Sequence, residues 1–518
     1  MGRHAYMDFL SYFRLESVAA FSVRVAKKYK AVLISSAVAA VMAYMFLFTN
    51  KLVNHDDIKA LFDLGVGLSS GRWMIDLLAK VTITGSMPWL NGSVAVLLIA
   101  FASCAIASLF EIENPIVQVV LAAVIMVFPG NMDVFSYMFT STAYSLGFLF
   151  SVLAVLLYQK GGKIGVLAGC LFGAMTLGIY QSYIEVTSTL LLLLVVKELL
   201  ENEKTAGQIF LRGIKSVLFL TACAALYYLI TALLMVISGG GFNDYAANYV
   251  ADGSFLHRIA YTYTSFVRLF TEGLLGLVNN PYSKLAHIFC LFLILANSLY
   301  ILVSLRDVKK ALLFVLCLVL LPLSMNSMFF IFRANGIRAM MSFGFIGLYI
   351  FSALLIERTA VKIRWKELSR QLILWTTVLI IINNICVLNR TSLRMHLAYE
   401  NAYSFFTTVL ADIKMTPGYD EDCKIAIIGY TDVHIYPIHE LGGGYVNGAL
   451  KDVINVYSRN SFLQYYLGFT SEFADKAEQL EITQMEEFKE MPRYPYYGSI
   501  RRIGDYLVVK LDEIILDE

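Results

Sequence analysis

The sequence predicts a polytopic α-helical membrane protein with about 11 transmembrane helices and a small α+β C-terminal domain outside the cytoplasm. Of the 518 residues, 58% are apolar or aromatic and 15% are charged, and the mean hydropathy is +0.66. A soluble chain would carry about 25% charged residues. With a formal net charge of only +2, this composition argues against a large soluble enzyme, a disordered protein and a nucleic-acid binder.

Eleven apolar runs are long enough to cross a membrane as helices. About 20 residues are needed, because the hydrocarbon core tolerates only a backbone that satisfies its own polar groups. The sixth run is the weakest, since Glu185 lies at its start and Lys197 near its end. We place the spans at 31–50, 93–110, 115–132, 141–158, 164–181, 183–199, 213–238, 285–305, 311–332, 339–356 and 371–389.

The distribution of Lys and Arg predicts how the chain is oriented. Residues 1–30 form a basic, amphipathic arm with six such residues and no signal-peptide cleavage site. If this arm is cytoplasmic, the arm and the other segments on the cytoplasmic side contain 20 Lys and Arg residues. The loops on the other side of the membrane, which are mostly longer, contain 9. This bias is typical of cytoplasmic loops. It predicts a multi-pass plasma-membrane protein whose transmembrane domain is 31–389 and whose outer side carries loops 51–92 and 239–284 and residues 390–518.

The outer segments contain recognisable secondary structure. In 255–278 the apolar residues recur at helical spacing, which predicts a helix lying in the membrane interface. In the C-terminal domain, 424–429 and 506–511 are strand-like, whereas 393–414 and 470–490 are typical of helices. The domain is therefore predicted to be a small α+β unit.

The segment after the first span carries the most informative polar residues, Asn-His-Asp-Asp at 54–57 and Gly-Arg-Trp at 71–73. Two adjacent carboxylates at a membrane exit are not needed for insertion. They can serve as a general base with an electrostatic or metal-holding partner. Alternatively, Asn54 or Asp56 caps a short interfacial helix over 57–64, whose start favours negative charge. The two interpretations are compatible, because a capped helix end also fixes a carboxylate in space.

Two further carboxylates lie near the predicted spans. Asp133 follows a Pro-Gly pair at 129–130, so it is either a turn residue or a functional one. Glu185 lies close to hydrocarbon, where a carboxylate needs a partner or a water-filled cavity. The alternative for Glu185 is that it extends to the interface and remains solvated.

Several arginines are candidates for binding a phosphate. Arg333 and Arg338 bracket an outer turn between two spans, and the planar guanidinium suits phosphate oxygens. They could equally anchor helix ends against membrane lipid head groups. Arg258 and Arg268, on the third outer loop, are weaker candidates.

Motifs of several soluble enzyme classes are absent from the sequence. There is no glycine-rich phosphate loop, no Gly-x-Ser-x-Gly elbow and no His-Glu-x-x-His pair. The cytoplasmic connections are too short for a nucleotide-binding domain. Any activated substrate is therefore expected to arrive from the membrane or from the outer side.

Taken in order, these motifs resemble a known class. The arm, the acidic motif at 54–57, the many spans and the outer C-terminal domain resemble GT-C membrane glycosyltransferases. Together with Gly-Arg-Trp at 71–73, Tyr-Gln-Ser-Tyr at 180–183 and Met-Pro-Arg-Tyr-Pro-Tyr-Tyr-Gly-Ser at 491–499, they resemble the bacterial serotype-converting glucosyltransferase family. The resemblance extends over nearly the whole chain.

The resemblance implies an activity and partners. Such enzymes of the bacterial inner membrane take a hexose, usually glucose, from a polyprenyl-phosphate sugar on the outer leaflet. They place it on a lipid-linked polysaccharide such as O-antigen, and a small flippase and a donor synthase commonly supply the donor. The catalytic carboxylate of the class maps onto Asp56 or Asp57, and a second acidic residue maps onto Asp133. Members differ in metal use, so a divalent cation remains open.

The corresponding hypothesis is an inverting displacement. One carboxylate of the acidic motif removes the acceptor proton, its neighbour or His55 positions it, and an arginine receives the leaving phosphate. The residues assigned to the site are Asp56 and Asp57 (catalytic), Asp133 and Glu185 (second acidic), Arg72, Arg258, Arg333 and Arg338 (donor phosphate), and His55, Tyr180 and Gln181 (positioning).

Other interpretations remain open at this point. A transporter or flippase would also have many spans, although the repeated halves with broken helices that are typical of transporters are not evident. A structural assembly factor without catalysis is a third class. In the C-terminal domain, Tyr494, Tyr496 and Tyr497 either bind acceptor sugar by aromatic contact or belong to a packed lid.

Overall fold

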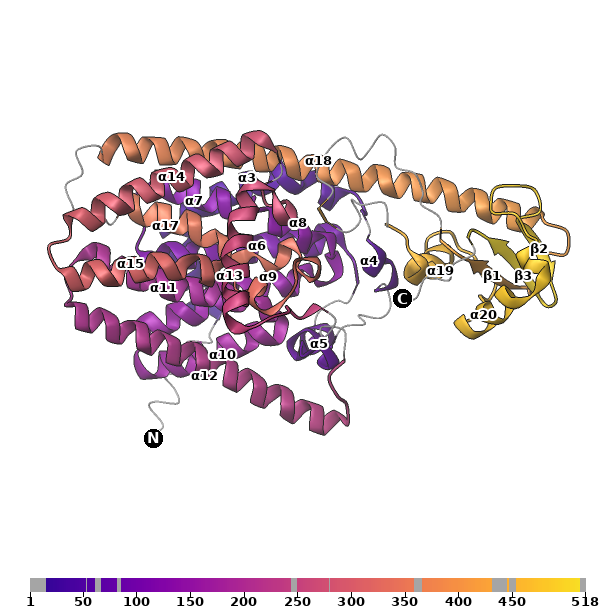
Figure 1. The fold of residues 1–518 in the computed structure, drawn as a ribbon, viewed down its shortest axis with the longest axis horizontal. Helices are drawn as coiled ribbons and strands as arrows, with labels where there is room; N and C mark the ends of the chain where they lie inside the picture. Colours follow the sequence, from indigo (N-terminus) through magenta and orange to yellow (C-terminus); the bar gives the residue numbers. More distant parts are fainter. Residues whose placement is uncertain are drawn as a thin grey trace.

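The structure is a computed structural model of the full chain. It describes residues 15–52, 54–60, 67–81, 85–243, 249–278, 280–357, 366–430, 445–446 and 453–512. A large bundle of helices is joined to a smaller domain that contains the strands (Figure 1).

The bundle is built from apolar helices of membrane-crossing length. In the described part of the chain, nine helices are long and apolar enough to cross a membrane. The protein is therefore a multi-pass helical membrane protein. These nine are α3 (Lys30–Thr49), α6 (Pro88–Phe110), α7 (Pro115–Met126) with α8 (Pro129–Ser136) as one span, α9 (Met138–Lys160), α10 (Gly162–Ile179), α12 (Ala206–Ser238), α14 (Pro281–Ser304), α15 (Val308–Met325) and α18 (Lys366–Met415).

The other two of the eleven predicted spans are helices that do not meet this criterion. The run at 183–199 is α11 (Ile184–Glu201), which carries four charged residues. The run at 339–356 begins with the short turns η6 (Ala339–Met341) and η7 (Phe343–Phe345) and continues as α17 (Ile346–Glu357). Both α11 and α17 are almost entirely buried against their neighbours. They are interior helices of the bundle.

Small residues allow α9, α10 and α12 to approach closely. A Cβ on Gly169 of α10 would lie 2.7 Å from the carbonyl oxygen of Ala154 on α9, and a Cβ on Gly173 would lie 2.5 Å from the sulfur of Cys223 on α12. Glycine at these positions lets the backbones pack tightly, as is common between membrane helices.

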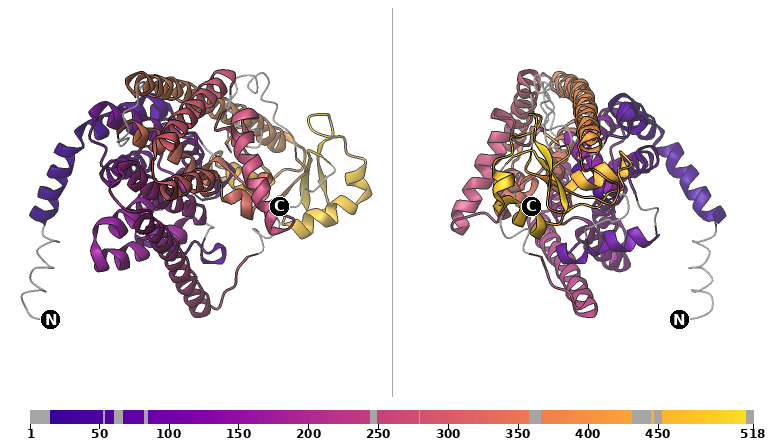
Figure 2. Two further views of the ribbon diagram at one scale, coloured as in Figure 1. Left: turned by 60° about the vertical axis from the view of Figure 1, so that its left-hand side comes forward. Right: turned by 90° about the vertical axis from the view of Figure 1, so that its right-hand side faces the viewer.

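Shorter elements lie between the long helices. They include α4 (His55–Lys59), η1 (Leu68–Ser70), α5 (Trp73–Val81), α13 (Phe255–Thr271), η4 (Leu274–Gly276), α16 (Met328–Ile331) and η5 (Ala334–Gly336). The helix predicted in 255–278 is confirmed as α13, which exposes the apolar side chains of Phe255, Leu256 and Val267. Before the bundle, α2 (Leu15–Lys28) continues the predicted arm and extends away from the other helices (Figure 2).

The C-terminal region is α+β, as predicted. It contains β1 (Lys424–Ile428), α19 (Val456–Tyr465), α20 (Lys476–Gln484), α21 (Glu486–Lys489), β2 (Ile500–Ile503) and β3 (Tyr506–Lys510). The sheet order is β1-β3-β2, in which β1 pairs parallel and β2 antiparallel with β3. The predicted strands at 424–429 and 506–511 are β1 and β3, whereas β2 was not anticipated.

The long helix α18 connects the two parts of the molecule. It continues without a break from the bundle to the strands (Figure 1), so residue 390, the predicted start of the C-terminal domain, lies inside it. Its second half, with Ala398, Phe406 and Val409, packs against α19 and β1 to form an apolar core separate from that of the bundle. The C-terminal domain thus begins on the same helix that ends the bundle.

Candidate active site

The acidic motif after the first span forms the short helix α4, and Asn54 caps it. The Asn54 Oδ1 accepts hydrogen bonds from the backbone N–H groups of Asp56 at 2.8 Å and Asp57 at 2.9 Å. Its amide nitrogen donates to the carbonyl oxygen of Ser136. Capping by Asn54 is therefore confirmed, although the helix begins at residue 55 instead of 57, and residues 61–66 lie outside the described part.

The two carboxylates of α4 have different surroundings. Asp57 is fully buried, and its Oδ1 and Oδ2 accept from the N–H groups of Phe139 at 3.0 Å and Met138 at 3.2 Å, at the start of α9. Burial raises the pKa of Asp57 to about 7, against the lowering effect of these two N–H groups and the Ser86 hydroxyl. The Asp56 side chain is 36% exposed and lies 3.7 Å from His55. Asp56 is thus the accessible carboxylate of the pair.

Asp133 does not lie in a turn but on the helix α8. It is buried, and its Oδ2 accepts from the backbone N–H of Met340 at 2.9 Å, inside η6. Arg338 immediately precedes η6 and is exposed, and its positive charge acts on Asp133. Asp133 therefore holds the turn that presents Arg338.

Glu185 is also a buried carboxylate with backbone partners. Its Oε1 accepts from the N–H of Met328 at 2.7 Å and from the hydroxyl of Ser327 at 3.4 Å, at the start of α16. Only 1% of the residue is exposed. The interpretation of a solvated side chain at the interface is therefore wrong, and Glu185 joins α11 to the segment that follows α15.

Arg72 lies against Tyr180, and the loop that carries Arg72 is bound by Gln181. The Arg72 guanidinium is 5.0 Å from the centre of the Tyr180 ring, and its Nη1 donates to the Tyr144 hydroxyl at 3.3 Å. The Gln181 amide donates to the Ser70 carbonyl oxygen at 2.9 Å, just before the Gly-Arg-Trp motif. Tyr180 and Gln181 thus orient the loop and the guanidinium of Arg72.

The other predicted phosphate-binding arginines are separated by the structure. Arg333 forms an ion pair of 2.6 Å with Asp252, and both side chains are at least half exposed. Arg258 lies near the start of α13, whose packing partners include α15 and α16. Of the two arginines in the 333–338 turn, Arg338 is the one connected to a buried carboxylate of the site.

Tyr137 lies within electrostatic range of several of these groups, and the sequence did not point to it. It separates α8 from α9, next to the backbone groups that bind Asn54 and Asp57. The charges of Asp56, Asp133 and Arg338 all act on its hydroxyl. A tyrosine at the start of a span is also typical of the aromatic belt of membrane proteins, so its sequence position alone was not informative.

The motif at 491–499 lies in the C-terminal domain, just before β2. The Tyr494 hydroxyl donates to Asp412 of α18 at 2.8 Å, so this side chain is packed. Tyr496 and Tyr497 are exposed. In the described residues, no group of three or more His, Cys, Asp or Glu side chains is arranged to hold a metal ion.

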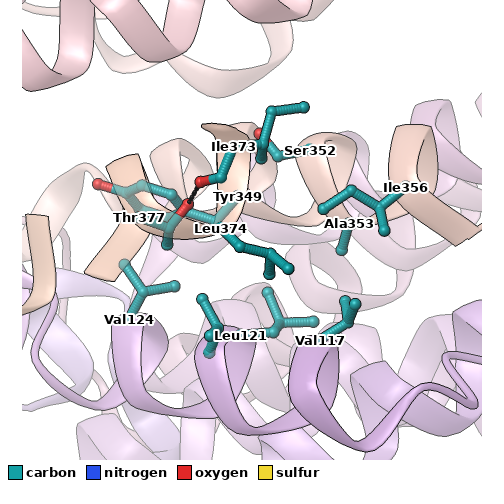
Figure 3. A pocket seen from close by; sticks show the side chains of 11 residues that line it. Val117, Leu121, Val124, Tyr349, Ser352, Ala353, Ile356, Ile373, Leu374 and Thr377 are labelled. Atoms are coloured by element: carbon teal, nitrogen blue, oxygen red, sulfur yellow. Dashed lines mark hydrogen bonds between the residues drawn. The ribbon is translucent and has the colours of Figure 1, made fainter. Parts of the chain in front are cut away.

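A small apolar pocket lies elsewhere in the bundle, between α7, α17 and α18 (Figure 3). Val117, Leu121, Ile356 and Leu374 are among the side chains that line it. The Thr377 hydroxyl at its edge donates to a backbone carbonyl of its own helix. Because no acidic or basic side chain lines this pocket, it is not part of the acidic site.

The structure is a membrane-embedded helical bundle in which a capped acidic helix follows the first span. The family model of the glucosyl transferase GtrII family matches residues 45–349, more than half of the chain. The chain therefore belongs to the GtrII glucosyltransferase family, as the resemblance predicted. No curated protein and no solved structure matches it.

Membership of this family makes the protein a membrane glucosyltransferase that acts in the modification of membrane-associated polysaccharide. Its substrates are accordingly a sugar donor and a sugar acceptor. The match includes every acidic and arginine residue assigned to the site, whereas the C-terminal domain lies outside it.

Proposed function

We propose that this enzyme transfers glucose from a polyprenyl-phosphate donor to a lipid-linked polysaccharide at the outer face of a bacterial inner membrane, with Asp56 as the general base. The observation that supports this assignment is the different exposure of the two carboxylates of α4. Asp57 is buried on the N-terminus of α9, whereas Asp56 is accessible beside His55. A base must be able to reach the acceptor hydroxyl.

The proposed reaction is a single displacement. The acceptor hydroxyl gives its proton to Asp56 while its oxygen bonds to C1 of the glucose. The bond between C1 and the phosphate oxygen breaks, and the electron pair leaves with the lipid phosphate, so the configuration at C1 is inverted. Arg338 neutralises the charge that develops on this phosphate, and Arg72 is the second candidate for this role.

A lipid-borne donor is supported by where the basic groups lie. Asp133 holds the turn of Arg338, and Tyr144 and Tyr180 hold Arg72. Both arginines lie close to membrane-spanning helices, where the phosphate of a polyprenyl lipid would lie. The distribution of Lys and Arg along the sequence predicts that this end of the bundle lies outside the cytoplasm.

The test measures glucose transfer by the purified enzyme in proteoliposomes that contain polyprenyl-phosphate glucose and a lipid-linked polysaccharide acceptor. Asp56→Asn should lower kcat by about 10²–10⁴-fold, the usual contribution of a general base. The matched control is Glu272→Gln, which removes an exposed carboxylate paired with Arg268 and should leave kcat unchanged. Transfer by Asp56→Asn within about threefold of wild type would contradict the assignment.

A further inference from the structure

The helix that carries Asp56 is anchored in two domains. On one side, Asp57 accepts backbone hydrogen bonds from the start of α9, which belongs to the bundle. On the other side, Ile58 is fully buried in the apolar core of the C-terminal domain, where it joins Phe406 of α18 and Phe462 of α19. Two neighbouring residues of one short helix thus bind different parts of the molecule.

Two lysines from the α4 region contact both ends of α19. The Lys59 Nζ lies 3.6 Å from the centre of the Tyr457 ring, in the first turn of α19. The Lys51 Nζ lies 4.7 Å from the centre of the Tyr466 ring, which follows the last turn. Both are cation–π contacts. Because Lys51 precedes α4 and Lys59 is its last residue, the two contacts hold α4 along the length of α19.

The helix α19 is itself fixed to the sheet of the C-terminal domain. Arg459 is buried and donates to the carbonyl oxygens of Ile427 at 2.5 Å and Gly429 at 2.8 Å, at the end of β1. Asn455 caps the start of α19 through the N–H of Ser458. The contacts therefore continue from the sheet through α19 to α4.

A helix as short as α4 does not hold its own geometry. It has five residues, and isolated helices of this length are unstable in water because nucleation is unfavourable. Its orientation must therefore come from the surfaces that it contacts. Catalysis is sensitive to such placement, since a shift of about 1 Å in a reacting group can lower a rate by about 10²-fold.

We propose that the C-terminal domain positions the catalytic base: α19 clamps α4 through Ile58, Lys59 and Tyr457, and this clamp sets the position of Asp56. The inference rests on the proposed function of Asp56. Ile58, Lys59 and Tyr457 are positioning residues, because they act through α4. The clamp joins a motif inside the matched family region to a domain outside that region.

The test compares variants of the full-length enzyme in the proteoliposome assay. Ile58→Ala should lower kcat by about 10- to 30-fold, and Lys59→Met by about 3- to 5-fold, with KM for donor and acceptor within twofold of wild type. Lys59→Arg keeps a cation over the Tyr457 ring and should restore at least half of kcat. Lys59→Met and Tyr457→Leu should not be additive when combined, because they remove the same contact.

The matched control is Ile482→Ala. Ile482 is also fully buried in the C-terminal domain, but in the apolar cluster that includes Ile428 and Met491 and not Ile58. This variant should lower the thermal stability of the domain and leave kcat per folded molecule unchanged. Equal effects of Ile58→Ala and Ile482→Ala on kcat would overturn the clamp, as would kcat within twofold of wild type in both Ile58→Ala and Lys59→Met.

A readout that does not depend on transfer separates the two proposals. Hydrogen exchange at the backbone N–H groups of Asp57 and Ile58 should be faster in Ile58→Ala and Lys59→Met than in wild type, and unchanged in Ile482→Ala. Faster exchange with no transfer by the wild-type enzyme would support the clamp and refute the proposed function. Unchanged exchange in both α4 variants would refute the clamp, whatever the activity.

Discussion

At the end of the bundle that carries α4, buried carboxylates accept hydrogen bonds from backbone N–H groups, whereas at the opposite end carboxylates pair with lysines. The helix α11 shows both. At its first turn, Glu185 binds the N–H of Met328. At its last turns, Lys197 lies 2.9 Å from Glu111 and 3.6 Å from Glu201, and Glu198 lies 2.6 Å from Lys204.

Under the proposed function, the pairs at one end stabilise the bundle and the groups at the other end act on the substrates. Lysine–carboxylate pairs at one end neutralise each other and join α6 to α11. At the other end, Asp57 and Asp133 accept hydrogen bonds from backbone N–H groups at the starts of helices. Their binding therefore does not depend on an ion pair with an arginine. Arg338 therefore remains exposed beside a buried carboxylate, where an incoming anion can reach it. The predictions below test this contrast.

Among the residues of this contrast, the largest effect is expected at Asp57. Burial raises its pKa to about 7, above the value of about 3.9 for an unfolded aspartate. Between these pH values the folded protein holds a proton that the unfolded chain has released, so the free energy of unfolding falls as the pH rises and levels off above pH 7. Asp57→Asn should weaken the pH dependence of the melting temperature between pH 5 and pH 7 and lower kcat by about 10- to 100-fold.

Thermal unfolding in detergent between pH 5 and pH 8, together with kcat, checks this prediction. Asp252→Asn removes an exposed carboxylate and should keep the pH dependence of the wild type. A melting temperature that changes with pH equally in the wild type and in Asp57→Asn would contradict the raised pKa of Asp57.

The next effect compares two arginines of the same turn. Arg338→Ala should raise KM for the donor by at least about 10-fold, since a charged hydrogen bond to phosphate contributes about 1.5–3 kcal/mol. Arg333→Ala should raise it less than about threefold, because Arg333 is already paired with Asp252 and surface pairs contribute little. Steady-state kinetics at varied donor concentration measures both KM values. Equal KM values for the two variants would contradict the assignment of Arg338.

The smallest effect on activity is expected at the opposite end. Lys197 is nearly buried between Glu111 and Glu201, so Lys197→Met should lower the free energy of unfolding by about 1–3 kcal/mol and leave kcat and both KM values unchanged. Lys204→Met, which removes a half-exposed lysine, should destabilise less. A changed KM for the donor in Lys197→Met would contradict the expectation that this end of the bundle affects stability and not substrate binding.

Much of the architecture was predictable because it depends on local patterns. The apolar runs predicted the long helices. The cap at Asn54 was predictable because its side chain binds the backbone N–H groups of residues only two and three positions further along the chain. The strands β1 and β3 are short apolar runs of the expected length. The strand β2, Ile-Arg-Arg-Ile, was not predicted, because its two arginines interrupt the apolar pattern and only pairing with β3 makes it a strand.

The roles of individual site residues depended on contacts between distant segments. Asp57 meets Phe139 across 82 residues, and Asp133 meets Met340 across 207. A sequence pattern does not tell which of two adjacent carboxylates will be buried by such a contact. For the same reason the sequence left Arg333 and Arg338 equivalent, and it did not anticipate Tyr137.

The sequence alone determined that this chain crosses a membrane many times, and its motifs indicated a glucosyltransferase with an acidic helix after the first span. Apolar runs and helix caps depend on residues that are close together in the sequence, so they can be recognised from the sequence alone. The tertiary structure decided that Asp56 is accessible while Asp57 is buried, and that α4 packs against the C-terminal domain. Burial is a property of the surfaces that surround a residue, and those surfaces come from parts of the chain far away in sequence.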